Sequence, residues 1–287
     1  VAKPCSVVVV GAGTAGLEAA CTAAEVGCQV TLLEKKDEIG GLSVEISKIP
    51  AKKRLADFPT YLKHRASKLS NLTIKTGVDA TVEDIKAYQP DLVVNATGSV
   101  PLLPPIEGLH ENLANADAAV YSIMDMIDNL DNYPEDLTGK KVVVVGGGAV
   151  GLDVVEFFAP RGAETTIIEM MPIIGNGLDA SSTASMKECM SKHHVTQMVN
   201  TALMKVNPHS FLVKYDGKEE ELPFDYGFVC LGMKAHTPIW EAIEQGFEGE
   251  NTEVINIGDS VRARRIIDGT DAGRHLVLNT LERLGYL

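Results

Sequence analysis

Two short stretches of this chain combine a glycine spacing with a later carboxylate in a way that suits dinucleotide binding. In the first, "VVVVGAGTAGLE", Gly11, Gly13 and Gly16 have G-x-G-x-x-G spacing, and Glu34 follows eighteen residues after Gly16. The first glycine of such a turn permits a tight bend, the second lets a pyrophosphate approach the backbone, and the third allows close packing of helix and strand. The later carboxylate accepts hydrogen bonds from a ribose, so the stretch predicts a nucleotide site.

The second stretch, "VVVVGGGAVGLD", repeats this pattern with Gly146, Gly148 and Gly151, and Glu169 again follows eighteen residues after the last glycine. An acid at this position favours the free 2′-hydroxyl of NADH and would repel the 2′-phosphate of NADPH. The next two residues are methionines, where a phosphate site would need arginine or lysine. The second stretch therefore predicts an NADH site.

The elements around both turns predict an α/β fold with two Rossmann-like domains. β-branched runs at 7–10 and 142–145 are typical of parallel strands that are buried on both faces. Each run leads into a helix, expected over 14–26 and from the second turn to about 159, and then into a second strand, expected over 29–33 and 165–168. The two units could be halves of one sheet that binds one dinucleotide. Because each carries its own glycines and acid, two sites for two dinucleotides is the simpler interpretation.

Composition excludes several other functions. The formal net charge of −13 argues against binding to nucleic acids or anionic membrane surfaces, because phosphates would repel it. No apolar run reaches the roughly 18–20 residues of a membrane span. The five scattered cysteines predict reduced thiols in the cytoplasm, and the lack of a C-x-x-C motif argues against thiol–disulfide exchange. The histidines show no metal-ligand spacing, so no metal site is expected.

Further short motifs extend the pattern over the whole chain. Gly40-Gly41 follows the first acid, Ala96-Thr97-Gly98 follows a strand expected over 91–95, and Gly258-Asp259 lies between a strand expected over 254–257 and a long last helix. This order resembles that of the two-dinucleotide-binding flavoprotein reductases. The resemblance implies that the first fingerprint holds FAD, that the A-T-G segment lines the crossover between domains, and that Asp259 binds the ribityl chain of the flavin.

Three stretches show a closer resemblance, namely "AKPCSVVVVGAGTAGLEAA", "PDLVVNATGSVPLLPPIEG" and "IGDSVRARRIIDGTDAGR". They look like the C-terminal half of multidomain relatives of Old Yellow Enzyme, such as 2,4-dienoyl-CoA reductases, enoate reductases, bile-acid-type enone reductases and trimethylamine dehydrogenase. In these enzymes an FMN-binding TIM barrel and a cysteine-bound iron–sulfur cluster precede the FAD/NAD unit. Neither is encoded here, so the resemblance implies a piece of a longer enzyme whose preceding FMN-binding barrel is its partner.

The resemblance also implies domain boundaries and site residues. We expect a discontinuous FAD domain at 1–112 and 250–287, and an inserted NADH domain at 113–249. The candidate cofactor-binding residues are Gly11, Gly13, Thr14, Ala15, Gly16, Glu34, Lys35, Gly41, Leu42, Arg54, Ala80, Ala96, Thr97, Gly98, Gly258, Asp259, Arg265, Ile266, Gly146, Gly148, Ala149, Val150, Gly151, Asp153, Glu169 and Gly232.

Two of these candidates have alternative roles. Asp153 lies either near the nicotinamide ribose or simply where it complements the dipole of the second helix. Arg265 begins the last helix, near the flavin pyrimidine by family position. The basic cluster of Arg262, Arg264 and Arg265 is either a solvated face or a docking patch for the barrel.

The expected reaction is hydride transfer from NADH to FAD, with electrons then passing to FMN and an iron–sulfur cluster in an enoate or dienoyl-CoA reductase partner domain. This step needs no catalytic acid, base or nucleophile from the chain, since the cofactors carry the reaction and the protein orients them. Two alternatives stay open. One is a structural module that binds only ADP, as in trimethylamine dehydrogenase, and the other is a stand-alone NADH:acceptor oxidoreductase.

Overall fold

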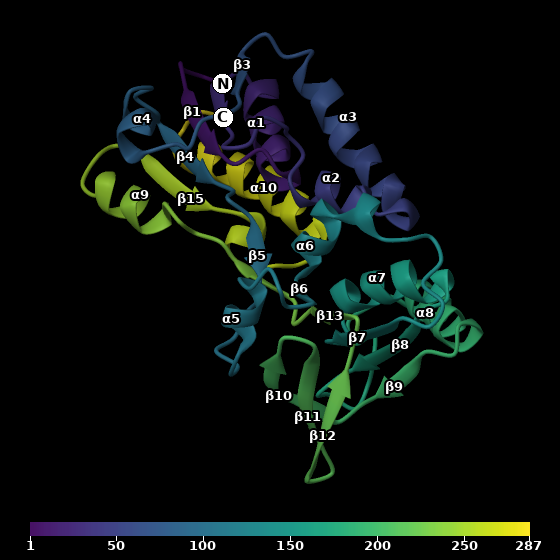
Figure 1. The fold of residues 1–287 in the computed structure, drawn as a ribbon. Coiled ribbons are helices and arrows are strands. Elements are labelled where there is room, and N and C mark those ends of the chain that lie inside the picture. The colour runs from purple at the N-terminus through teal and green to yellow at the C-terminus, as the bar shows by residue number, and fades with distance from the viewer. The chain divides into compact units, whose positions relative to one another are not determined.

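The computed structural model describes all 287 residues and divides them into two compact units. The first unit comprises residues 1–48, 52–100 and 234–287, and the second comprises 49–51 and 101–233. Each unit is built on a five-stranded parallel sheet. Helices surround the strands of each unit (Figure 1). The predicted α/β class with two Rossmann-like domains is therefore confirmed. None of the helices combines the length and the apolarity needed to cross a membrane.

The sheet of the first unit has the strand order β15-β4-β1-β2-β3 and is parallel throughout. Its strands are β1 (Ser6–Val10), β2 (Gln29–Leu33), β3 (Leu72–Lys75), β4 (Leu92–Asn95) and β15 (Glu253–Asn256). Side chains alternate between the two faces of a strand, and both faces of β1 are buried. Val7 and Val9 lie in the core formed with α1 (Thr14–Glu25), α3 (Asp57–Ala66) and α10 (Ile266–Arg283). Val8 and Val10 lie in a second core with α4 (Val82–Lys86) and α9 (Trp240–Gly246).

The sheet of the second unit has the order β6-β13-β7-β8-β9. Its strands are β6 (Val120–Tyr121), β7 (Lys141–Val145), β8 (Glu164–Ile168), β9 (Thr196–Met198) and β13 (Tyr226–Val229). The helix α7 (Ala149–Phe158) packs on β7 and β8, and an antiparallel sheet of β10 (Thr201–Asn207), β11 (Ser210–Tyr215) and β12 (Lys218–Pro223) shares a core with Val143 and Val145. The turn between β11 and β12 has positive φ at Asp216 and Gly217, which is typical of a tight hairpin.

The unit boundaries differ from the domain boundaries expected from the sequence. The chain leaves the first unit after residue 100 and returns to it at 234, rather than at 112 and 250. The connecting strands β5 (Ser99–Pro101) and β14 (Met233–Ala235) pair with each other at these two crossings. The helix α9 belongs to the first unit because Ile243 and Phe247 fill the core beneath β1, a long-range contact that no local pattern indicates.

The remaining elements are short apart from α8. They are α2 (Leu42–Ser47), η1 (Pro50–Ala56), α5 (Leu109–Leu113), α6 (Ile123–Asp128), η2 (Leu130–Asn132), η3 (Ala159–Arg161), α8 (Ala180–Lys192) and η4 (Gly258–Ser260).

The two longest helices of the first unit, α1 and α10, cross at very short range (Figure 1). A β-carbon on Gly273 of α10 would lie 2.6 Å from the carbonyl oxygen of Ala15 and 3.3 Å from the amide nitrogen of Ala19. Only glycine permits this approach. The last helix is thereby fixed against the helix that follows the first glycine turn.

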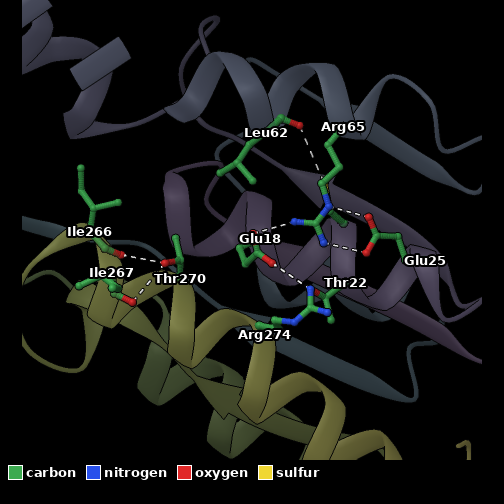
Figure 2. Close-up of polar contacts among 10 residues, drawn as sticks. Glu18, Thr22, Glu25, Leu62, Arg65, Ile266, Ile267, Thr270 and Arg274 are labelled. Atoms are coloured by element: carbon green, nitrogen blue, oxygen red, sulfur yellow. Dashed lines mark hydrogen bonds and ion pairs between the residues drawn. The ribbon is translucent and has the colours of Figure 1, made fainter. Parts of the chain in front are cut away.

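A charged cluster joins α1 to both neighbouring helices, as Figure 2 shows. The Glu18 carboxylate, whose side chain is only 9% exposed, accepts a hydrogen bond from Arg65 Nη1 at 2.7 Å and lies 3.6 Å from Arg274 Nη1. Arg65 also forms a two-pronged ion pair with Glu25 and lowers the pKa of that carboxylate. Thr22 donates to Glu18 at 3.3 Å. A buried carboxylate needs such partners because desolvation of an unpaired charge is costly.

Candidate nucleotide-binding sites

The first glycine turn lies between β1 and β4, at the point where the strand order of the sheet reverses direction. Ligands of open α/β sheets bind at such switch points, beyond the carboxyl ends of the strands. Gly11 has a φ of +99°, and a β-carbon there would lie 2.3 Å from the carbonyl oxygen of Ala96. A β-carbon on Gly16 would lie 1.9 Å from the carbonyl oxygen of Gly11. Both glycines are thus required by the packing of the protein itself.

Gly13 differs from these two glycines because space is open beside it. Its backbone is extended, with φ −72°, and a β-carbon would meet only the Cα atom of Gly41, at 4.0 Å. The protein therefore gives no packing reason for glycine at this position. A group that approaches the backbone from outside gives one, which fits a pyrophosphate cradle.

The second turn repeats this arrangement between β7 and β13. Gly146 has a φ of +106°, and its β-carbon would lie 2.1 Å from the carbonyl oxygen of Cys230. A β-carbon on Gly151 would lie 1.8 Å from the carbonyl oxygen of Gly146. Gly148 has an extended backbone and nothing within 4 Å of its added β-carbon. The second and open glycine of each turn is the position that a phosphate could approach.

A free helix N-terminus adjoins each open glycine. Gly13 and Gly148 are the N-caps of α1 and α7, neither helix has a side-chain cap, and neither has an acidic residue in its first turn. The first-turn amides, which include Thr14 and Ala15 in α1 and Ala149 and Val150 in α7, have no acceptor within their helix. These N–H groups and the helix dipole favour an anion.

The two predicted ribose-binding carboxylates are held in the same way. Oε2 of Glu34 accepts from the amide of Ala12 at 2.7 Å, and Oε1 accepts from the amide of Lys36 at 2.8 Å. Oε2 of Glu169 accepts from the amide of Gly147 at 2.7 Å, and Oε1 accepts from Met171 at 2.8 Å. Each carboxylate is fixed beside its glycine turn, and each oxygen keeps a lone pair for a ribose hydroxyl.

Segments distant in the sequence complete the first site. Gly258 has a φ of +65°, and its β-carbon would lie 2.7 Å from that of Ala15, so the Gly258-Asp259 turn lies directly beside the first glycine turn. The Asp259 carboxylate accepts from the amide of Arg264 at 3.0 Å and from the hydroxyl of Ser99 at 2.9 Å. The structure thus brings the Gly11–Gly16 turn, Gly41, the Ala96–Gly98 segment and the Gly258-Asp259 turn together.

Thr97 and Gly98 lie on the chain that leaves the first unit. The Thr97 hydroxyl donates to the carbonyl of His236 at 2.6 Å, and the His236 amide donates to the carbonyl of Gly98 at 2.8 Å. Gly98 has a φ of +80° with nothing within 4 Å of an added β-carbon. The outgoing and returning segments are therefore joined at this edge of the sheet.

Other predicted residues lie at the periphery of the first site. Lys35 forms an exposed ion pair with Asp79, and the 96%-exposed side chain of Arg54 lies 3.5 Å from Asp57. Leu42 begins α2 directly after Gly41, and Ala80 packs with the core beneath β1. Ile266 begins α10, and Arg265 is its exposed N-cap and pairs with Asp268 at 3.2 Å.

In the second unit, Asp153 lies near the start of α7, and Gly232 ends the segment that follows β13. Gly232 has a φ of +94°, and its carbonyl accepts from the amide of Leu102 at 2.9 Å. The backbone of Cys230 lies against Gly146, the first glycine of the turn, and its side chain is buried. Burial, and then the charge of Asp153, raises the pKa of its thiol, so it stays neutral.

Sequence reasoning missed four polar residues at the first site. Ser99, Asn95, Asn256 and Ser260 lie at the carboxyl edge of the sheet and connect the segments described above. The sequence does carry one signal for them, because a polar asparagine stands at the end of each of two apolar strands. Asn95 ends the strand directly before Ala96-Thr97-Gly98, and Asn256 ends the neighbouring strand of the sheet.

Known families and proteins match both the fold and the turns. A family model described as pyridine nucleotide-disulphide oxidoreductase matches residues 51–262, and one described as FAD dependent oxidoreductase matches residues 6–60. The NADH oxidase of Thermoanaerobacter brockii is 31% identical over 93% of this chain and 40% of its own length. Cinnamate reductase of Clostridium sporogenes is 29% identical over 91% of this chain and 37% of its own.

Solved structures agree. The structure of a 2-naphthoyl-CoA reductase in complex with 2-naphthoyl-CoA superposes with a TM-score of 0.81 and 30% identity, over 95% of this chain and 39% of that chain. The chain thus spans about two fifths of the length of these relatives.

Proposed function

Because the chain belongs to the pyridine nucleotide-disulphide oxidoreductase family, we propose that it is a module that moves a hydride from NADH to FAD and feeds the electrons to a further centre. The observation that carries this proposal is the repetition of one arrangement: an open glycine, a free helix N-terminus and a fixed carboxylate occur together in each unit. Two such cradles suit two dinucleotides.

The resemblance to the FAD/NAD module of multidomain Old Yellow Enzyme relatives is confirmed by the matching reductases and by the shared fold. FAD and a pyridine nucleotide are accordingly the cofactors of this class of oxidoreductase. The pyridine nucleotide is NADH in our proposal, since Glu169 stands where a 2′-phosphate would otherwise lie.

We assign FAD to the first unit. The FAD-dependent family model covers the first glycine turn and Glu34, and the Gly258-Asp259 turn lies beside this glycine turn. When bound, FAD supplies a two-electron hydride acceptor that can also release electrons singly. The chain's own residues bind and orient: first-turn amides of α1 hold phosphate, Glu34 holds ribose, and Asp259 holds the ribityl hydroxyls.

In the second unit, the amides of Ala149 and Val150 and the carboxylate of Glu169 play the corresponding parts for NADH. Hydride transfer needs no side chain to accept or donate a proton. The chain therefore contributes by binding and orienting the cofactors and by excluding NADPH.

We propose that the rest of the protein supplies an FMN-binding TIM barrel and an iron–sulfur cluster, since this chain covers only about two fifths of relatives such as cinnamate reductase. A cytoplasmic location belongs to the same proposal and is supported by the five free thiols.

The spectrum of the purified chain tests the central claim. We expect flavin absorption bands that lose intensity when NADH is added without oxygen, because hydride then passes to the flavin. Bound ADP without flavin bands would contradict the proposal and would instead indicate a structural module. Bands that NADH does not bleach would leave the second cradle without a role in reduction and would equally contradict it.

The preference for NADH depends on Glu169. Replacing it with serine removes the ribose acceptor, the negative charge and the two hydrogen bonds to backbone amides. We expect the ratio of kcat/KM for NADH over NADPH to fall by about 10- to 100-fold, as is usual when a charged hydrogen bond is lost. Steady-state reduction of an artificial dye measures this ratio.

Glu164, at the exposed start of β8, the strand that Glu169 directly follows, provides the matched control. Glu164→Ser removes the same charge far from the glycine turn and should leave the ratio unchanged. A wild-type chain that prefers NADPH would refute the role of Glu169.

A further inference from the structure

We infer that Asn256 is a positioning residue for the flavin: with Asn95 and Ser260 it fixes the Gly258-Asp259 turn against the Ala96–Ser99 segment. This inference rests on the proposed function, because it concerns the site assigned to FAD. It assigns a role to residues that have no place in the glycine fingerprints.

The first observation is the location of the two asparagines. β4 and β15 are neighbours in the sheet, and Asn95 and Asn256 are paired in register at their carboxyl ends. Asn95 precedes the Ala96-Thr97-Gly98 segment directly, and Asn256 is separated from Gly258 by a single residue. Each asparagine is therefore attached to one of the two segments that must be held at a set spacing.

The second observation is the set of contacts that joins them. Asn256 Oδ1 accepts from Asn95 Nδ2 at 2.8 Å and from the Ser260 hydroxyl at 2.7 Å. Asn256 Nδ2 donates to the carbonyl of Ser260 at 3.1 Å, so this side chain contacts Asn95, which precedes the Ala96–Gly98 segment, and Ser260, which follows the Gly258-Asp259 turn. Asn95 Nδ2 also lies 3.3 Å from the Thr97 hydroxyl. One amide thus connects both segments.

The third observation is the burial of these polar groups. Asn95 is fully buried, Ser260 is 2% exposed, and Asn95 Oδ1 is enclosed without a hydrogen-bond partner. Buried polar groups cost free energy unless they are hydrogen-bonded, and valine or isoleucine would suit the interior of a parallel sheet better. The network is therefore a poor means of stabilising the sheet alone. Its directional bonds are suited to setting the geometry of the two segments.

A second bridge, which is part-buried, agrees with this role. The Ser99 hydroxyl donates to Asp259 Oδ2 at 2.9 Å, so the Ala96–Ser99 segment and the Gly258-Asp259 turn are joined by a second hydrogen bond besides the asparagine contacts. Asp259 is the residue assigned to the ribityl hydroxyls, and its carboxylate can meet them only if the turn keeps its place. Loss of the contacts of Asn256 with Asn95 and Ser260 should displace the Asp259 carboxylate.

The test compares Asn256→Ala with Asn71→Ala in the purified full chain. Asn71 is a half-buried asparagine of the same unit that donates to the carbonyls of Ala24 and Cys28 at 2.8 Å, on the opposite edge of the sheet. Both variants lose side-chain hydrogen bonds and should lower Tm to a similar degree. Only Asn256→Ala should raise the Kd for FAD, by about tenfold, and alter the visible spectrum of the bound flavin.

Ser260→Ala provides a milder second variant, because it removes only the hydroxyl, which lies 2.7 Å from Asn256 Oδ1 and 2.6 Å from the carbonyl oxygen of Ile257. It should also weaken FAD binding, and its effect should not add to that of Asn256→Ala, since both break the same link. The Kd for NADH, measured on the same samples, should stay unchanged in all variants.

The outcomes separate the two claims. A wild-type chain without affinity for FAD would overturn the proposed function and this inference with it. A wild-type chain that binds FAD, with Asn256→Ala and Ser260→Ala binding it equally well, would overturn the inference alone. Equal weakening by Asn71→Ala would do the same, because the effect would then be one of general stability.

Discussion

Gly13→Ala should weaken FAD binding by at least about tenfold, or about 1.4 kcal/mol, while the chain stays folded. The physical reason is that the backbone of Gly13 has φ and ψ values open to any residue, and an added β-carbon meets only the Cα atom of Gly41, at 4.0 Å. The methyl group therefore fits the protein and occupies the space through which a pyrophosphate reaches the first-turn amides of α1. Flavin fluorescence titration measures the Kd, and Tm reports the fold.

Gly148→Ala is the matched experiment in the second unit, where nothing lies within 4 Å of the added β-carbon. We expect it to weaken NADH binding to the same degree and to leave the Kd for FAD unchanged. The two substitutions should thus have opposite selectivity: each weakens the binding of one nucleotide and leaves the Kd of the other unchanged. If either one weakened both ligands equally, or neither, the assignment of one nucleotide to each turn would be wrong.

Arg65→Met should lower the free energy of unfolding by about 3–5 kcal/mol, because it leaves a buried carboxylate without its main partner. Glu18 is 9% exposed at its side chain and would keep only Thr22 and the half-exposed Arg274, whose nearest guanidinium nitrogen is 3.6 Å away. The substitution also breaks the two-pronged pair with Glu25, which holds α3 against α1. Urea denaturation followed by circular dichroism measures the change.

Two further variants test whether the loss of stability comes from leaving the buried Glu18 carboxylate unpaired or simply from losing an ion pair. Glu18→Leu combined with Arg65→Met removes both charges and should recover much of the lost stability, since no buried charge is then left unpaired. Lys86→Met breaks an exposed ion pair of similar length, 2.7 Å, with Glu250 and should cost no more than about 1 kcal/mol. A double variant less stable than Arg65→Met would show that the cluster stabilises the helices beyond the needs of Glu18.

Much of the architecture could be predicted from the sequence because its signals are local. The strand Gln29–Leu33 has the predicted bounds, and the strand runs and helices around both turns agree to within one or two residues. The roles of Gly11 and Gly16 follow from steric contact within one strand–turn–helix unit and its neighbouring strand, which the spacing alone implies. The carboxylates Glu34 and Glu169 stand at the ends of the second strands for the same reason.

Contacts between segments that are distant in the sequence could not be predicted from such local patterns. The helix α9, placed in the second domain from the sequence, packs instead beneath β1, because Ile243 and Phe247 fit the core there. Glu18 and Arg65 could be recognised as a pair only once α3 lay against α1.

The same division holds at the first site. The sequence by itself determined the two glycine turns and the acid that belongs to each, since backbone sterics and side-chain alternation act over some twenty residues. The tertiary structure alone decided that Asn95 and Asn256, 161 positions apart, become neighbours in register. The strand order of the sheet sets that meeting, and strand order depends on the packing of the whole unit.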